Sequence, residues 1–257
     1  MQTSLVESLK QTPQGKEAEA ILRSCVHCGF CTATCPTYQI LGDELDSPRG
    51  RIELCKQGME GRAVSAKTQL HLDRCLHCLA CETVYPSGLQ YGRLVDIGRE
   101  MVDQRVPRPF SVRLLRRVLR SVLPYPRRFG ALLRIGRRLK PLLPASWRTK
   151  LPVQHLAGPW PAARHARKML VLEGCVQSVA TPDINAAAAR VLDRLGISLI
   201  RAANAGCCGA LSHHLSDHYG ALHFMRRNID AWWPYGESGA EAIVMTASGC
   251  GAVVKDY

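Results

Sequence analysis

Residues 25–36 read Cys-Val-His-Cys-Gly-Phe-Cys-Thr-Ala-Thr-Cys-Pro, a run with the spacing C-x2-C-x2-C-x3-C-P. Its cysteines are Cys25, Cys28, Cys31 and Cys35. Bacterial iron–sulfur proteins use this spacing, in which three close thiolates hold one cluster and the fourth ligates the other cluster. A structural zinc site is normally satisfied by two cysteine pairs and needs no following proline. The run therefore predicts iron–sulfur binding rather than zinc binding.

A second run, residues 75–86, repeats the spacing with one change. Tyr85 stands where the fourth cysteine is expected, before Pro86. Under crossed ligation Cys35 completes a [4Fe-4S] site with the second run, and the first three cysteines are left with Tyr85. We expect this incomplete site to hold a [3Fe-4S] cluster, to hold a [4Fe-4S] cluster with a substitute ligand, or to be empty. Cys55 is a spare thiol, although an inert buried cysteine in a helix is the simpler interpretation. The second run contributes Cys75, Cys78 and Cys81.

The charge of the chain is concentrated in one segment. The 257 residues include 34 Lys plus Arg and 21 Asp plus Glu, a formal net charge of +13, and 46% are apolar. Residues 105–168 hold 17 of the basic residues, no acidic residue and nine of the fifteen prolines. The apolar content excludes a disordered or fibrous chain. No run is long enough for a membrane-spanning helix, and the first ten residues lack a signal-peptide core, so we expect a cytoplasmic protein. Twelve cysteines in that compartment indicate metal or redox chemistry rather than disulfides.

Short apolar runs alternate with helical patterns from residue 169 onward. The runs 169–172, 197–200 and 242–245 predict strands, and 184–195 and 220–232 predict helices. This β-α-β-α-β order implies a parallel sheet. A cysteine follows each strand, so the thiols should converge at one sheet edge, either as a further metal site or as a surface of reduced, redox-active thiols. These residues are Cys175, Cys207, Cys208 and Cys250.

Five stretches together resemble the iron–sulfur subunits of bacterial glycolate oxidases, also called glycolate dehydrogenases. They are residues 25–52, 172–177 (LEGCVQ), 204–215 (NAGCCGALSHHL), 228–234 (NIDAWWP) and 246–252 (TASGCGA). The resemblance implies partner subunits that carry FAD and oxidise glycolate to glyoxylate. It implies an α+β chain in which 1–104 is an all-α, two-cluster ferredoxin-like domain, 105–168 a basic Pro-rich helical linker, and 169–257 a partial α/β cysteine-rich (CCG-type) domain with a short parallel sheet.

Two departures from the family pattern affect these expectations. The second run ends in Tyr85 instead of cysteine, and the chain stops at Tyr257, before a second cysteine-rich module. We therefore expect a fragment or truncated product, whose residues after Gly249 lack the packing that follows in a complete domain. The C-x-x-C that completes a cluster-binding set in relatives is absent, because Val253 lies three residues after Cys250.

The sequence predicts an electron-transfer subunit without catalytic residues of its own. No Gly-rich dinucleotide fingerprint follows a strand, so flavin should be bound by partners. Electrons would pass from the FAD of a partner through the clusters to a membrane quinone or another acceptor. A related lactate or glycerol-3-phosphate dehydrogenase subunit would share these motifs, and a zinc-stabilised interaction module would share the cysteines.

The basic segment, residues 105–168, contains patterns of basic amphipathic helices. Such helices can dock acidic partner subunits or lie on an anionic membrane, here the cytoplasmic face of the inner membrane. A solvated helix face explains them equally well, and nucleic-acid binding is not expected because no recognition motif is present. His27 and His77 are candidates for tuning a cluster, and His213 and His214 for metal ligation, although surface positions are simpler interpretations. Residues 232–234 (Trp-Trp-Pro) predict a helix end packed in the core.

Overall fold

The computed structural model describes residues 1–142, 144–149 and 151–257, which form two compact units, residues 1–109 and 110–257. None of the helices in these ranges is long and apolar enough to cross a membrane. The helices of the first unit are α1 (Glu7–Lys10), α2 (Pro13–Ser24), α3 (Phe30–Ala33), α4 (Pro36–Leu41), α5 (Pro48–Met59), α6 (Ala66–Asp73) and α7 (Tyr91–Arg105).

Helix α7 lies at the centre of the first unit, and α2, α5 and α6 pack against it. The start of α5 is fixed by Pro48 at its first turn and by the Ser47 hydroxyl, which accepts a hydrogen bond from Gly50 N. Helix α2 begins in the same way, with Thr12 as its cap. The core contains buried side chains from all four helices: Leu22, Ile52, Leu72, Leu94, Val95 and Val102.

Cys55 is a packing residue between α5 and α7. It is fully buried, and a Cβ added at Gly98 of α7 would collide with its Sγ. Burial raises the pKa of Cys55 to about 12, so the thiol stays protonated at neutral pH. The structure thus agrees with the interpretation of Cys55 as an inert core cysteine.

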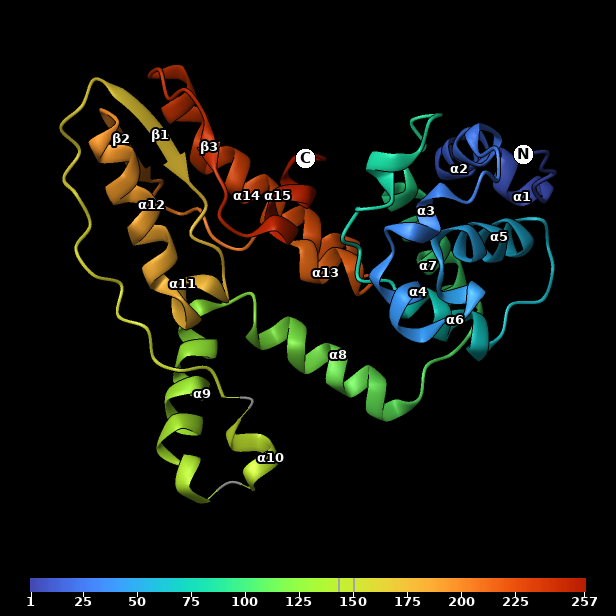
Figure 1. Ribbon diagram of the computed structural model, residues 1–257, viewed down its shortest axis with the longest axis horizontal. Helices are drawn as coiled ribbons and strands as arrows, with labels where there is room; N and C mark the ends of the chain where they lie inside the picture. Colours follow the sequence, from blue (N-terminus) through green and yellow to red (C-terminus); the bar gives the residue numbers. More distant parts are fainter. Residues whose placement is uncertain (143, 150) are drawn as a thin grey trace. The chain divides into compact units, whose positions relative to one another are not determined.

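The second unit contains the predicted parallel sheet, with strand order β2-β1-β3 (Figure 1). Residues 167–171 of β1 pair in register with 197–201 of β2, and Leu170 pairs with Ile243 of β3. The predicted α+β class and the short parallel sheet are confirmed. The elements are α8 (Phe110–Val122), α9 (Pro126–Arg138), α10 (Ala145–Arg148), β1 (Arg167–Val171), α11 (Gln177–Ala180), α12 (Pro182–Arg194), β2 (Ile197–Arg201), α13 (Ala210–His214), α14 (His218–Glu237), β3 (Ile243–Val244) and α15 (Ser248–Val254).

The loop after β2, residues 206–209 (Gly-Cys-Cys-Gly), is held against α14 by Asn228. The fully buried Asn228 amide accepts from Gly206 N at 2.9 Å and donates to Cys207 O at 2.9 Å. Tyr257 Oη donates to Cys208 O at 2.6 Å, and Val253 is buried. Helix α15 and Tyr257 therefore pack against this loop.

The expected helix end at residues 232–234 is wrong, because α14 ends at Glu237. Helix α14 continues through Pro234 to Glu237, and only the first tryptophan is buried, since Trp232 is 6% exposed and Trp233 is 66% exposed. A proline removes one backbone donor, but the chain can remain helical where the freed carbonyl lies near the solvent-facing end of a helix. Trp232 stacks on the Tyr257 ring, with ring centroids 6.0 Å apart.

Substitution of Gly209 tests the close packing of the cysteine loop on α14. Gly209 has φ +84°, and a Cβ there would lie 3.0 Å from the backbone oxygen of Ala221. Gly196 also has a positive φ, +78°, but a Cβ there would meet nothing within 4 Å. Gly196→Ala should therefore cost only the conformational strain, about 1–2 kcal/mol. Gly209→Ala should cost about 1–3 kcal/mol more, measured by denaturant unfolding. Equal losses would contradict the close contact with α14.

Candidate metal centres

The two cysteine runs adopt the same unusual backbone. The residues before the second cysteine of each run, His27 and His77, have φ of 55° and 52°. The residues after it, Gly29 and Leu79, have φ of 81° and 57°. Such angles cost free energy for residues other than glycine, about 1–2 kcal/mol each, and cluster at functional sites. The repeated strain indicates that both runs are shaped to wrap around a group.

One cavity gathers four thiols from both runs. We call it the four-thiol cavity; it is lined by Cys35, Cys75, Cys78 and Cys81, together with Pro36, Thr37, Pro48, Arg51, Leu76, Leu79 and Tyr91. Three of the four thiols come from the second run, and Cys35 comes from the first. Cys35 lies directly before Pro36, at the N-terminus of α4. The lining is the set that crossed ligation predicts.

A second cavity, the three-thiol cavity, contains the remaining thiols of the first run. It is lined by Cys25, Cys28, Cys31 and Tyr85, together with Val26, His27, Gly29, Arg49, Ile52, Pro86 and Ser87. Among the lining residues that the structure describes, Cys55 is absent from both cavities. Tyr85 therefore lines this cavity in place of a fourth thiol, and the described lining contains no cysteine besides Cys25, Cys28 and Cys31.

Tyr85 presents a buried hydroxyl to the Cys31 thiol in the three-thiol cavity. The two side chains are close enough to share a hydrogen bond. Burial, and then the hydrogen bond with Cys31, raise the pKa of Tyr85, so the phenol stays protonated. The hydroxyl can therefore donate to an acceptor inside the cavity, such as a cluster sulfide.

The donor atoms of both cavities fit iron–sulfur clusters. Sulfur donors are soft ligands, which favour iron–sulfur clusters and zinc over magnesium or calcium. Burial raises the pKa of Cys31 and of Cys81, so metal-free thiols are protonated and metal binding has to release those protons. The four-thiol cavity has a complete ligand set for a cubane, and the three-thiol cavity has three thiols for three irons.

The four-thiol cavity is bordered by hydrogen-bond donors that reach its sulfur atoms. Backbone N of His77 and Oη of Tyr91 donate to Cys75 Sγ at 3.4 and 3.6 Å. Thr37 Oγ1 lies 3.1 Å from Cys35 Sγ. Donors to the sulfur atoms stabilise their negative charge, and they are one of the means by which proteins adjust cluster potentials.

A buried carboxylate, Asp46, connects the segments that carry these thiols. Its Oδ1 lies 3.4 Å from Arg51 Nη2 and 3.0 Å from His71 Nδ1, and its Oδ2 accepts from Arg74 Nη1 at 2.8 Å. Burial alone would raise the pKa of Asp46, but the hydrogen bonds from His71 and Arg74 outweigh it and hold this pKa below its usual value. Sequence analysis missed Asp46 and Arg51, although both lie in the stretch 25–52. The available signal was their position on either side of the Ser-Pro sequence that starts α5.

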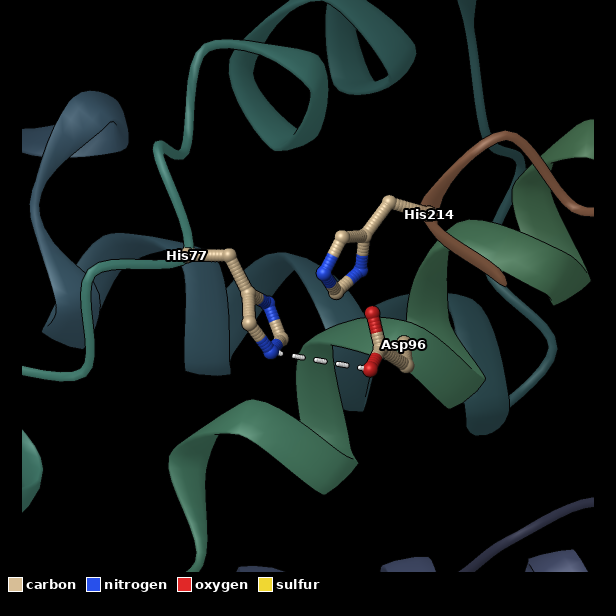
Figure 2. Close-up of side chains that lie close together, drawn as sticks. All are labelled: His77, Asp96 and His214. Atoms are coloured by element: carbon tan, nitrogen blue, oxygen red, sulfur yellow. Dashed lines mark ion pairs between the residues drawn. The ribbon is translucent and has the colours of Figure 1, made fainter. Parts of the chain in front are cut away.

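The rings of the two histidines in these runs lie in different surroundings. His77 Nε2 faces Asp96 of α7, with 3.7 Å between Nε2 and Oδ2 (Figure 2). The His27 ring is exposed and contacts Met1 Sδ at 2.5 Å. His213 and His214 lie at the end of α13. His77 reaches the half-buried Cys75 thiol through its backbone N–H.

The second unit brings together the four cysteines that follow its strands. The Cys207 thiol shares hydrogen bonds with Cys175 and Cys208, and Cys208 shares another with Cys250. The hydrogen bonds that Cys208 accepts from Cys207 and Cys250 hold its pKa below the usual value of a thiol. The four thiols thus lie together at one sheet edge, as predicted. We call these four cysteines the C-terminal thiol cluster.

Comparisons with known proteins agree with this arrangement. Residues 21–89 match the 4Fe-4S dicluster domain, and residues 169–255 match a cysteine-rich domain. The glycolate oxidase iron-sulfur subunit of Escherichia coli (strain K12) is 58% identical over the whole chain, which spans 63% of that protein. The probable glycolate oxidase iron-sulfur subunit of Bacillus subtilis (strain 168) is 28% identical over 93% of the chain and 60% of that protein.

A more distant relative is an uncharacterized iron-sulfur protein of Methanocaldococcus jannaschii, 22% identical over 95% of the chain and 46% of that protein. No solved structure matches the chain. The dicluster match supports iron–sulfur clusters in the first unit, and the chain spans about three-fifths of the length of the two glycolate oxidase relatives. Over that part of their length, the chain is similar to the glycolate oxidase iron–sulfur subunits, and it contains a 4Fe-4S dicluster domain followed by a cysteine-rich domain.

Proposed function

We propose that the chain is the iron–sulfur electron-transfer subunit of a glycolate oxidase complex. It would accept electrons from the FAD of a partner subunit that oxidises glycolate to glyoxylate, and pass them towards a membrane quinone or another acceptor. The observation that carries the proposal is the pair of thiol cavities in one helical unit, in a chain similar over its full length to subunits of that name. We assign no catalytic residue to the chain, and the chain alone is not expected to turn over glycolate.

The ligands follow the lining of the two cavities. We propose a [4Fe-4S] cluster in the four-thiol cavity, and a [4Fe-4S] or [3Fe-4S] cluster on the three thiols beside Tyr85. Such clusters supply one-electron transfer when bound. The four-thiol ligands are Cys35, Cys75, Cys78 and Cys81, and the three-thiol ligands are Cys25, Cys28 and Cys31.

The contribution of the chain is to position and shield these groups. The left-handed residues of each run, His77 among them, turn the loop around the cavity. Tyr91 and the His77 backbone N–H donate to Cys75, and the Tyr85 hydroxyl lines the other cavity as a donor. Burial excludes water, which strengthens each of these interactions.

The C-terminal thiol cluster is proposed as a further redox-active or metal-binding site. All four thiols are connected by hydrogen bonds at the carboxyl edge of the sheet, and the Asn228 amide fixes the loop that carries two of them. Iron and sulfide analysis of anaerobically purified chain, with Cys208→Ser as the comparison, shows whether this set holds iron in addition to the first unit.

Reduction by glycolate tests the proposed function. In a mixture of the chain with its flavin-carrying partner subunits, glycolate should reduce the clusters, seen as reduced-cluster signals in low-temperature EPR. Omission of the partners should abolish the signals, because the chain has no proposed substrate site. Reduction by lactate or glycerol 3-phosphate but not by glycolate would favour a related dehydrogenase. Bound zinc with no EPR signal would eliminate the electron-transfer function in favour of an interaction module.

Crossed ligation is tested by Cys35→Ser. This change should damage the cluster of the four-thiol cavity and leave the signal of the three-thiol cavity in place, since Cys35 lines only the former. Cys55→Ala is the matched control, because Cys55 lines neither cavity and should affect neither signal. Loss of the three-thiol signal in Cys35→Ser, with the other retained, would overturn the assignment. The measurement is EPR with spin quantitation before and after dithionite reduction.

We also propose that the basic segment docks on an anionic membrane surface through α8. Four apolar side chains of this helix are 46–71% exposed: Phe110, Leu114, Leu115 and Val118. At 100° per residue they lie on one side of the helix, with the arginines Arg113, Arg116, Arg117 and Arg120 opposite or flanking them. Residues 105–168 contain no acidic residue. An apolar face beside arginines suits the boundary between acyl chains and anionic headgroups.

Vesicle flotation tests the membrane contact. The chain should float with vesicles of phosphatidylglycerol and phosphatidylcholine, and less with phosphatidylcholine alone or at high salt, because screening weakens the attraction. Leu115→Asp with Val118→Asp should lose most of the binding. Ile40→Asp changes an 81% exposed apolar residue outside the segment and should retain it. Equal binding by the two variants, or none by the unchanged chain, would contradict the proposed contact.

A further inference from the structure

Helix α5 separates the two cavities and presents a different arginine to each. At its first turns Pro48 and Arg51 line the four-thiol cavity, and Arg49 and Ile52 line the three-thiol cavity. The two arginines are only two residues apart, and their surroundings differ. Arg51 is 1% exposed, whereas the Arg49 side chain is 43% exposed.

The Arg51 guanidinium is fixed by several hydrogen bonds next to the thiols. Its Nε donates to His71 O at 2.8 Å, and its Nη1 donates to Thr37 Oγ1 at 3.1 Å and lies 4.0 Å from Cys35 Sγ. It also hydrogen-bonds to the Tyr91 side chain, whose hydroxyl reaches Cys75 Sγ. Arg51 therefore acts on one thiol directly and on a second through Tyr91.

The charge of Arg51 is only partly balanced. Asp46 is the carboxylate that pairs with it, at 3.4 Å, and the same carboxylate also pairs with Arg74 at 2.8 Å. Asp46 thus divides its charge between Arg51, whose side chain is 1% exposed, and Arg74, whose side chain is 41% exposed and screened by water. Arg49, in contrast, pairs with Glu44 at 2.8 Å, and both side chains are more than two-fifths exposed, so water screens their charges.

A buried positive charge favours the reduced form of a neighbouring redox group. Reduction adds one negative charge to the group, and the attraction between that charge and a guanidinium is strong where water is excluded. A buried carboxylate has the opposite effect. Charge, hydrogen bonds to sulfur and burial are the means by which a protein sets cluster potentials.

We propose that the buried Arg51–Asp46 pair sets the reduction potential of the cluster in the four-thiol cavity, with Arg51 raising it and Asp46 lowering it. The inference rests on the proposed function, since it requires a cluster in that cavity. Both are positioning residues: neither is a ligand, and each acts through its charge and its hydrogen bonds. The three-thiol cavity has no corresponding buried ion pair among its described lining residues.

Redox titration followed by EPR tests the pair with isosteric or near-isosteric variants. Arg51→Gln should make reduction of the four-thiol cluster at least tenfold less favourable, a decrease of about 59 mV for one electron. Asp46→Asn should shift the potential in the opposite direction. Arg51→Lys keeps the charge and should stay closer to the unchanged chain than Arg51→Gln does. Arg49→Gln is the matched control and should leave the four-thiol potential in place, because its charge is exposed and paired.

Opposite signs distinguish a charge effect from loosened packing. If both variants moved the potential in the same direction, or neither moved it while the cluster signal stayed intact, the role of the pair would be refuted and the proposed function would stand. If the unchanged chain showed no four-iron signal at all, the proposed function would fail first. Should Arg51→Gln not fold, the other two variants still decide the question. Relative to the unchanged chain, Asp46→Asn should raise the potential and Arg51→Lys should stay close to it, and a null shift in Asp46→Asn contradicts the proposal.

Discussion

The buried carboxylate of Asp46 is the constraint on which the N-terminal unit depends. It joins α5 through Arg51, α6 through His71, and the residue before Cys75 through Arg74. These are the segments that have to meet if a thiol from the first run is to share a cavity with thiols from the second. Removal of one partner from a buried ion pair costs about 3–5 kcal/mol, because the remaining charge is left without compensation. The network therefore fixes the relative positions of the two runs.

The two units assemble their thiols by different physical means. In the first unit, short loops with left-handed residues such as His77 and Leu79 fold back on themselves, and buried charges hold the loops together. In the second unit, the parallel sheet brings the thiols together, since every strand ends at the same edge. The loop after β2 is then held in place by one side chain. The Asn228 amide accepts a hydrogen bond from this loop and donates another to it.

Local sequence patterns predicted most of the helices and strands. They could not predict features that depend on contacts with distant segments, such as the end of α14 and the burial of Arg51. Apolar periodicity located β1, β2 and α12 within two residues or so, because burial of one face leaves a direct trace in sequence. The end of α14 was wrong because residues 232–234 (Trp-Trp-Pro) predict a helix end, whereas the burial of Trp232 and its stacking on Tyr257 are tertiary contacts that leave no local pattern. Spacing predicted the grouping of the thiols. Burial of Arg51 was not predictable, because an arginine in an exposed helix has the same local pattern.

The two cavities differ in charge because of two residues, Tyr85 and Arg51. The cysteine spacing marks Tyr85 as a departure from the pattern and gives no sign of Arg51. Tyr85 replaces a thiolate, which carries a full negative charge when it binds metal, with a neutral phenol whose pKa is raised by burial. Arg51 adds a buried positive charge to the other cavity, which has the full set of thiols. The three-thiol cavity therefore lacks one thiolate charge, whereas the four-thiol cavity has all four thiols beside a buried cation that Asp46 only partly balances. In both cases burial makes the difference in charge effective, because water would otherwise screen it.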